Sequence, residues 1–311
     1  MEQLFGARIR HPTNPEGNEK GHFPSWLRTP LPKGENLYQT DNIIHEHRLH
    51  TVCEEAKCPN RLECFSKKTA TYLILGNQCT RACGFCEIGF SKAPPPPDPH
   101  EPKRVAESSK ALGLKHVVIT MVARDDLPDG GAYHLVQVIK AVRKEIDGVT
   151  IEVLTSDFAG NFEALDGVID ESPEIYNYNI ETTRRLTPTV RHKATYDRTL
   201  KILSHIKKRN RSRFVKSGLM VGFGESVDEV CETISDLHDA GVDIITIGQY
   251  LRPSKNKLQV KEFVPPERYK AFEEYGRSIG VLHVYAGPFV RSSYNADLVI
   301  KRTEDEFSAT R

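Results

Sequence analysis

The sequence predicts an α/β fold, namely a partial (βα)6-type TIM barrel with N-terminal and C-terminal extensions. From residue 71 onward, short apolar runs alternate with longer segments of helical periodicity. The apolar runs lack the polar alternation of a half-exposed sheet, which indicates parallel strands covered on both faces. Six or seven such units can curve into a full or partial barrel, and an open doubly wound sheet is the alternative.

Each predicted strand is rich in β-branched or aromatic residues, which suit a buried pleated surface. In chain order the strands cover residues 71–76, 116–120, 150–155, 174–180, 214–222, 243–248 and 281–287. Each predicted helix has apolar residues at three- and four-residue spacing, as in DEVCETISDL (228–237). In chain order the helices lie near residues 101–113, 131–147, 161–170, 194–209, 226–240 and 266–279.

Composition excludes several classes of protein. The 311 residues contain 43 Lys and Arg against 42 Asp and Glu, so no global field favours nucleic acid or an anionic membrane. No apolar run approaches the roughly 20 residues that span a bilayer, and the first residues lack the apolar stretch of a secretory signal. We therefore expect a cytoplasmic protein without nucleic-acid or membrane partners.

Six of the seven cysteines lie between residues 53 and 86, in two groups of three. The first group has C-x4-C-x5-C spacing and the second has C-x3-C-x2-C spacing: Cys53, Cys58 and Cys64, then Cys79, Cys83 and Cys86. In a reducing compartment, clustered cysteines are more often metal ligands or redox groups than disulfides. Cys231, alone in a helical segment, is expected to be a small buried apolar residue.

The second group directly follows the predicted strand 71–76, so it belongs at the C-terminal end of the strands, where barrels and doubly wound sheets bind ligands. Three thiolates in a tight loop can hold three corners of an iron-sulfur cube and leave one iron open. A structural zinc site needs four closed ligands, and His100 and His116 are too distant in sequence to complete one locally. A zinc site or a redox role remains the alternative.

The first group can hold a second, auxiliary cluster that is again one cysteine short. The alternative is a structural cap in which the three thiols only pack. The charged neighbours in CEEAKCPNRLEC argue against plain packing, because cysteines in such surroundings are seldom inert core residues.

The C-x3-C-x2-C loop, with Phe85 before its last cysteine and a β-strand before the loop, resembles the radical S-adenosylmethionine (SAM) superfamily. The resemblance implies a [4Fe-4S] cluster whose open iron binds SAM. It also implies reductive cleavage of SAM to a 5′-deoxyadenosyl radical that removes hydrogen from an unactivated carbon.

The pairing of both cysteine patterns is similar to the lipoyl synthase family, and the similarity extends over most of the chain from about residue 40. The stretches that carry it are VVITMVARDDLPDGGA (117–132), IEVLTSDFAGN (151–161), NYNIETTRRL (177–186), KSGLMVGFGE (216–225), TIGQYLRPSKNKL (246–258) and GPFVRSSYNAD (287–297). The chain departs from the family pattern at Tyr178, where the family has His, and at Ala159, where Arg is usual. These departures affect the expected substrate contacts.

The resemblance implies that a serine of the RSSY motif is the fourth ligand of the auxiliary cluster and takes part in catalysis. We assign this role to Ser293, with Ser292 as the alternative. A hard alkoxide is a weaker partner for soft iron-sulfur chemistry than a thiolate. It could leave as the cluster gives up sulfide. Without the motif, a Ser-Ser pair would indicate only a loop with backbone-bonding hydroxyls.

The implied reaction inserts two sulfur atoms, at C6 and C8 of an octanoyl chain on a carrier lysine, with the auxiliary [4Fe-4S] cluster as donor. Implied carriers are lipoyl domains of 2-oxoacid dehydrogenase E2 subunits or the glycine-cleavage H protein. A reductant such as ferredoxin or flavodoxin and an iron-sulfur carrier that rebuilds the cluster are also implied.

For SAM, the resemblance and the strand-end position indicate Gly130 and Gly131, whose missing side chains let backbone approach the methionyl group. The alternative for these glycines is a loop that begins a helix. Asn179 and Arg191 are candidates for the polar ends of SAM.

The expected organisation along the chain is an extended arm (1–40), an auxiliary-cluster segment (41–70), the radical SAM barrel (71–287) and a C-terminal extension with the RSSY motif (288–311). The arm is rich in Pro, Gly and charge and has no clear periodicity. Competing functions are a biotin synthase-like or methylthiolating enzyme, and a metal-containing RNA-binding module. The first would need another auxiliary pattern, and the second would need a basic face with interleaved aromatic residues.

Overall fold

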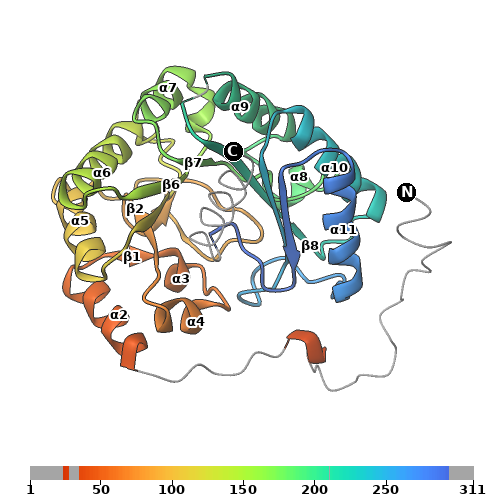
Figure 1. The fold of residues 1–311 in the computed structure, drawn as a ribbon, viewed down its shortest axis with the longest axis horizontal. Coiled ribbons are helices and arrows are strands. Elements are labelled where there is room, and N and C mark those ends of the chain that lie inside the picture. Colours follow the sequence, from red (N-terminus) through yellow and green to blue (C-terminus); the bar gives the residue numbers. More distant parts are fainter. Residues whose placement is uncertain (1–23, 28–34, 210, 294–311) are drawn as a thin grey trace, which may run out of the picture.

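An eight-stranded, mostly parallel sheet forms the centre of the molecule (Figure 1). The structure, a computed structural model, describes residues 24–27, 35–209 and 211–293. The strands, in spatial order, are β1 (His50–Thr51), β2 (Thr71–Ile74), β5 (His116–Met121), β6 (Thr150–Leu154), β7 (Ile175–Asn177), β8 (Phe214–Val221), β9 (Ile244–Gln249) and β10 (His283–Gly287). The edge strand β1 pairs antiparallel with β2, and all the following neighbours pair in parallel.

Six helices follow six of the parallel strands and surround the sheet on its outer face (Figure 1). They are α5 (Glu101–Ala111), α6 (Ala132–Glu145), α7 (Phe162–Asp170), α9 (Tyr196–Arg209), α10 (Val227–Asp239) and α11 (Pro266–Ser278). The parallel strands lie side by side in chain order, without the reversal of order that defines a doubly wound sheet. The predicted (βα)6-type partial barrel is therefore confirmed, and the open-sheet alternative is wrong.

The remaining elements precede β2 or lie in the loops of the barrel. They are η1 (Ser25–Leu27), α2 (Glu35–Glu46), α3 (Val52–Glu55), α4 (Arg61–Ser66), β3 (Gln78–Cys79), β4 (Gly89–Phe90), η2 (Phe158–Gly160) and α8 (Thr187–Val190). Helix α2 runs across the expected boundary between residues 40 and 41, so the chain has no break there. Most of the expected arm, and the end of the C-terminal extension, lie outside the described residues.

Strand β7 ends three residues earlier than expected. The backbone N–H of Ile180 donates to the Ser217 hydroxyl (3.0 Å) instead of to a strand carbonyl. Glu181 then adopts a left-handed conformation with φ of 70°. This bond to Ser217, on the neighbouring strand β8, takes the place of a backbone ladder bond at this position.

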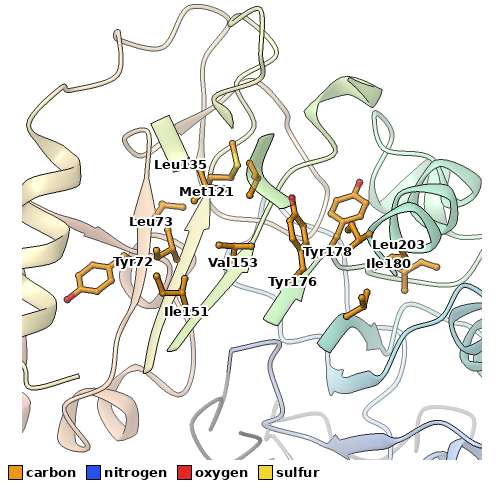
Figure 2. Packing of buried hydrophobic residues seen from close by; sticks show 14 of the residues in the cluster. Tyr72, Leu73, Met121, Leu135, Ile151, Val153, Tyr176, Tyr178, Ile180 and Leu203 are labelled. Carbon is orange, nitrogen blue, oxygen red and sulfur yellow. The ribbon is translucent and has the colours of Figure 1, made fainter. Parts of the chain in front are cut away.

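The outer core fills the space between the strands and the helices, and Figure 2 shows part of it. Ile151 and Val153 of β6 point outward from the barrel, and Leu203 of α9 belongs to the same buried cluster (Figure 2). The alternate residues of β6, Glu152 and Leu154, therefore face the barrel interior, because successive side chains of a strand point to opposite faces.

The barrel interior is layered. At the N-terminal end of the strands, Ile175, Phe214 and Ile244 form a small apolar cluster. Adjacent to it lies a buried polar layer, in which Lys216 Nζ donates to both carboxylate oxygens of Glu152 at 3.0 Å. The side-chain amide of Asn177 donates to the same carboxylate (3.0 Å). This floor supports the C-terminal half of the interior, where the strands leave room for a cavity.

Candidate active site

A cavity of about 340 Å³ opens at the C-terminal end of the strands and brings both cysteine groups together. Its wall includes Cys53, Cys58, Cys64, Cys79 and Cys86, together with Ser292 and Ser293. Cys83 lies outside the lining but close to Cys79 and Cys86, since the three thiols interact electrostatically. The position at the strand ends is the usual one for ligands in this architecture.

The loop of the second group is closed by backbone hydrogen bonds. Strand β2 leads into Leu75 and Gly76, both with positive φ, and these turn the chain into the loop. The short strands β3 and β4 pair in parallel at its base, and Ser91 N donates to Cys79 O (3.0 Å). Gly84 lies against Leu258, where an added Cβ would come within 2.8 Å of the leucine side chain. The glycine is thus required by close packing of the loop on the barrel mouth.

Arg81, between the first two cysteines of the loop, anchors it to the barrel. Its guanidinium binds Asp125 through two nitrogens (2.7–3.2 Å) and Asp157 at 2.5 Å. Asp157 is buried and also accepts from Arg198 (2.9 Å). A forked guanidinium between two carboxylates has a defined geometry, so this network fixes where the cysteine loop lies.

The first group lies on α3 and α4, directly before β2. Thr51 caps α3, because its hydroxyl accepts from Glu54 N (3.3 Å). Cys53 lies within this short helix, and Cys58 N donates back to Cys53 O (3.1 Å). Two short helices joined by a tight turn thus direct three thiols toward one wall of the cavity.

The RSSY segment reaches the first group from the other end of the chain. The side-chain amide of Asn60 donates to Phe289 O (2.7 Å), across 229 positions of sequence. The side-chain amide of Asn179 donates to the Ser292 hydroxyl (3.2 Å), so this hydroxyl already has a hydrogen-bond partner. Ser293 also faces the cavity, and it has no hydrogen-bond partner within the part of the chain that the structure describes.

The three thiols of each group are free and could ligate a metal ion or a metal cluster. Tetrahedral zinc with bonds of about 2.3 Å brings its sulfur ligands to within about 4 Å of each other. Among the described residues, neither cysteine group has its three sulfurs within 4.8 Å of one another; the set that does meet this spacing is Asp41, His45 and Glu54. Arg61 already binds Asp41 and Glu54 there (2.6 and 3.0 Å).

Burial raises the pKa of the cavity thiols. The pKa of Cys53 and of Cys86 rises to about 12, and that of Cys64 and of Cys83 to about 11. Neighbouring thiols contribute to each rise, because one thiolate disfavours another. A metal that bound here would therefore have to displace these protons, and its positive charge would offset the repulsion between the thiolates.

Two of the four expected SAM contacts line the cavity and two do not. Asn179 and Arg191 lie in its wall. Gly130 and Gly131 are outside the lining as far as the structure describes it; an added Cβ on Gly131 would meet Leu75 at 2.5 Å. Gly131 directly precedes α6 with φ of 91°, so the turn and its packing require a glycine there, and the role of both glycines in binding SAM stays a prediction.

Glu181 and Arg291 are two of several cavity residues that the sequence analysis did not single out. Desolvation raises the pKa of the Glu181 carboxyl, although the guanidinium of Arg191 opposes this rise. An acidic residue directly after an apolar strand was the available signal. Arg291 belongs to the RSSY motif and lies next to Cys58, but only the serines of the motif had been considered.

The partial barrel and the cysteine loop after β2 define a radical SAM protein. A model of the Radical SAM superfamily matches residues 73–237. Within this class, a model of the N-terminal domain of lipoyl synthase matches residues 8–58. The chain is also 59% identical over 302 residues to a lipoyl synthase of Protochlamydia amoebophila, covering 95% of this chain and 94% of the relative. It belongs to the lipoyl synthase family and is a sulfurtransferase of the radical SAM class.

A further relative agrees with this assignment, and a solved structure agrees with the fold. A lipoyl synthase of Chlamydia trachomatis is 54% identical over 296 residues and covers 95% of both chains. The crystal structure of Streptococcus suis SuiB bound to S-adenosylmethionine matches with a TM-score of 0.55 at 11% identity. That match covers 82% of this chain and 56% of SuiB, and it supports the fold alone. Among the helices of the described residues, none is both long and apolar enough to cross a membrane.

Proposed function

We propose that this chain binds two [4Fe-4S] clusters and SAM, and that it inserts two sulfur atoms at C6 and C8 of an octanoyl chain carried on a protein lysine. One observation carries the proposal: both cysteine groups and the RSSY serines open into the same cavity. When bound, the cluster on the second cysteine group would supply, together with SAM, a 5′-deoxyadenosyl radical. The auxiliary cluster on the first group would supply sulfide.

The cavity wall between the two cysteine groups suits an alkyl chain. It includes Leu73, Val122, Leu154 and Leu219. Such a wall binds the octanoyl chain through apolar burial, worth about 0.8 kcal/mol for each CH₂ removed from water. It also keeps water and other hydrogen donors away from the reacting carbons.

Cys79, Cys83 and Cys86 would hold the cluster that binds SAM. Arg191 interacts with Cys83 and is held by Asn179 O (2.5 Å) and by the Tyr178 ring, which lies 4.8 Å from the guanidinium carbon. A guanidinium fixed in this way suits a carboxylate such as that of the methionyl group. Asn179 supports the same region by accepting from Gly218 N (3.0 Å).

Cys53, Cys58 and Cys64 would hold the auxiliary cluster, with Ser293 as its fourth ligand. Ser292 is the weaker candidate because its hydroxyl already accepts from Asn179. Arg291 lies next to Cys58 and would offset the negative charge of thiolate-bound iron. The unit that carries this cluster is the segment 41–70, completed by the start of the extension 288–311.

Lipoyl domains are the substrate class, and the E2 subunits of 2-oxoacid dehydrogenases and the glycine-cleavage H protein are the carriers proposed. A low-potential donor such as ferredoxin or flavodoxin would supply electrons. An iron-sulfur carrier would rebuild the auxiliary cluster after each turnover.

The test is an iron and sulfide count after anaerobic reconstitution. The native protein should hold about eight irons, and Cys53→Ala and Cys79→Ala about four each, if the groups bind independent cubes. Cys231→Ala is the matched control, because this cysteine is buried in α10 and should leave the count at eight. A native count of about four, or zinc in the first group, contradicts the proposal.

Activity separates the two serines. An octanoyl-lysine peptide incubated with SAM and a strong reductant should give the dithiolated product with the native protein. Ser293→Ala should abolish product, while Ser292→Ala should retain most of it. The reverse order of effects would transfer the ligand role to Ser292.

A further inference from the structure

The rim of the cavity has a basic loop that the chemistry described above does not use. It runs from Leu251 to Glu262, between β9 and α11, and so lies at the C-terminal end of the strands with the cavity. Leu251 and Pro253 line the cavity itself. The same twelve residues contain four cations: Arg252, Lys255, Lys257 and Lys261.

This loop is held in one conformation by bonds to its surroundings. Leu258 N donates to Gly84 O (3.0 Å), and Lys261 N donates to Gly222 O (2.8 Å). The Ser254 hydroxyl donates to Glu87 (2.8 Å), a residue of the cysteine loop. The guanidinium of Arg252 binds backbone carbonyls of its own loop. A surface fixed before binding loses little conformational entropy when a partner arrives.

The positive charge of the loop is only partly offset nearby, since Lys257 interacts electrostatically with Glu87. Arg252, Lys255 and Lys261 are exposed and Lys257 is half-buried, and in the described part of the chain none of the four forms an ion pair. The acidic residues nearby are already matched, since Glu87 pairs with Lys57 (2.7 Å) and Glu262 with Arg268 (2.8 Å). The loop therefore presents excess positive charge beside the cavity entrance.

The other basic run of the sequence, KKRNRSR (207–213), lies at the opposite end of the barrel. It follows α9 and precedes β8, and Lys207 pairs with Asp243 (2.6 Å), directly before β9. Arg209 pairs with Asp170 (2.5 Å) at the end of α7. Because this basic run lies at the N-terminal end of the strands, it cannot contact a partner at the cavity entrance.

We propose that the loop 251–262 is the docking surface for a carboxylate-rich face of the carrier protein, an inference that rests on the proposed function. A cavity of about 340 Å³ is too small for a folded domain, so the body of the carrier must rest on the rim. Free positive charge on a preformed rim selects an acidic partner and accelerates its encounter.

The test reverses two exposed charges, in Lys255→Glu/Lys261→Glu, and leaves Arg252 in place because it braces the loop. The matched control is Lys201→Glu/Lys208→Glu, which makes the same charge change on exposed residues of α9. Each holoprotein is assayed with an octanoylated H protein and with a short neutral octanoyl-lysine peptide. The dissociation constant of the H protein is measured separately by calorimetry.

The loop variant should raise both KM and Kd for the H protein about tenfold or more, because close like charges oppose docking. Its kcat and KM for the peptide should stay unchanged, and the control should behave as the native protein. An unchanged Kd for the H protein, or an equal loss with the peptide, overturns the proposal. If native protein makes no product from either substrate, the proposed function fails instead, and the calorimetric Kd still decides whether this loop docks the carrier.

Discussion

Lys216→Met should destabilise the protein strongly, because it breaks the ion pair in the floor of the barrel. Lys216 and Glu152 are both fully buried, and their charged groups are 3.0 Å apart. Removing the ammonium leaves the Glu152 carboxylate with the amide of Asn177 (3.0 Å) and, farther away, His116 Nε2 (3.9 Å) as its polar neighbours. Removing one partner of a buried pair costs about 3–5 kcal/mol, because the other charge stays desolvated.

Equilibrium urea unfolding under anaerobic conditions measures this cost. With a denaturant slope of about 3 kcal/mol/M, the midpoint should fall by about 1–1.7 M. The double variant Lys216→Met/Glu152→Gln should recover most of the loss, since no buried charge remains. Lys110→Met is the control, because it breaks an exposed pair with Glu145 and should leave the midpoint in place.

Two results would refute this reasoning. A single variant whose midpoint lies within about 0.3 M of the native value would show that the pair contributes little. A double variant as unstable as the single variant would show that lost packing by the lysine stem, rather than the stranded carboxylate, is the cause.

The remaining predictions concern the site and its supports. Arg81→Met should cost the reconstituted protein about four irons, because the loop loses its carboxylate anchors; a full count would contradict this. Gly248→Ala should lower iron content and activity, since its Cβ would lie 2.1 Å from Val290 O and displace the RSSY segment. The control Gly167→Ala has open space around it and should leave stability unchanged or slightly raised. Burial raises the pKa of the Glu225 carboxyl above the ordinary 4.5. The protonated carboxyl therefore adds to the free energy of unfolding in full below about pH 4.5, and this contribution is lost as the pH rises through the pKa of the folded state. Glu225→Gln should therefore flatten the dependence of the urea midpoint on pH, and an unchanged slope would refute the assignment.

Local patterns were sufficient for the elements of the barrel. The strands and helices appear where periodicity and β-branched composition indicate them, because those signals reflect burial of one face or both. The end of β7 could not be predicted, since it depends on the Ser217 hydroxyl, a group on the neighbouring strand. Contacts between strands are not encoded in the spacing of one segment.

The site was predictable where spacing itself determines the chemistry. Five of the six cysteines and both RSSY serines line one cavity, and Cys83 lies close to Cys79 and Cys86 outside its lining. Gly130 and Gly131 show the limit of this reasoning, because their positive φ and the crowding of Gly131 by Leu75 already require glycine whether or not SAM binds there. The sequence can indicate that a position requires glycine, but only the structure shows which atoms lie against that position.

The hydrogen bond between Asn60 and Phe289 has a consequence for biosynthesis. The first cysteine group leaves the ribosome early, but the strand and serine that complete its pocket come at the far end of the chain. Closing so long a loop is slow, and domains emerge from the ribosome N-terminus first. A chain that is cut short before β10 would keep all six cysteines and still lack a finished pocket for the sulfide-donating cluster.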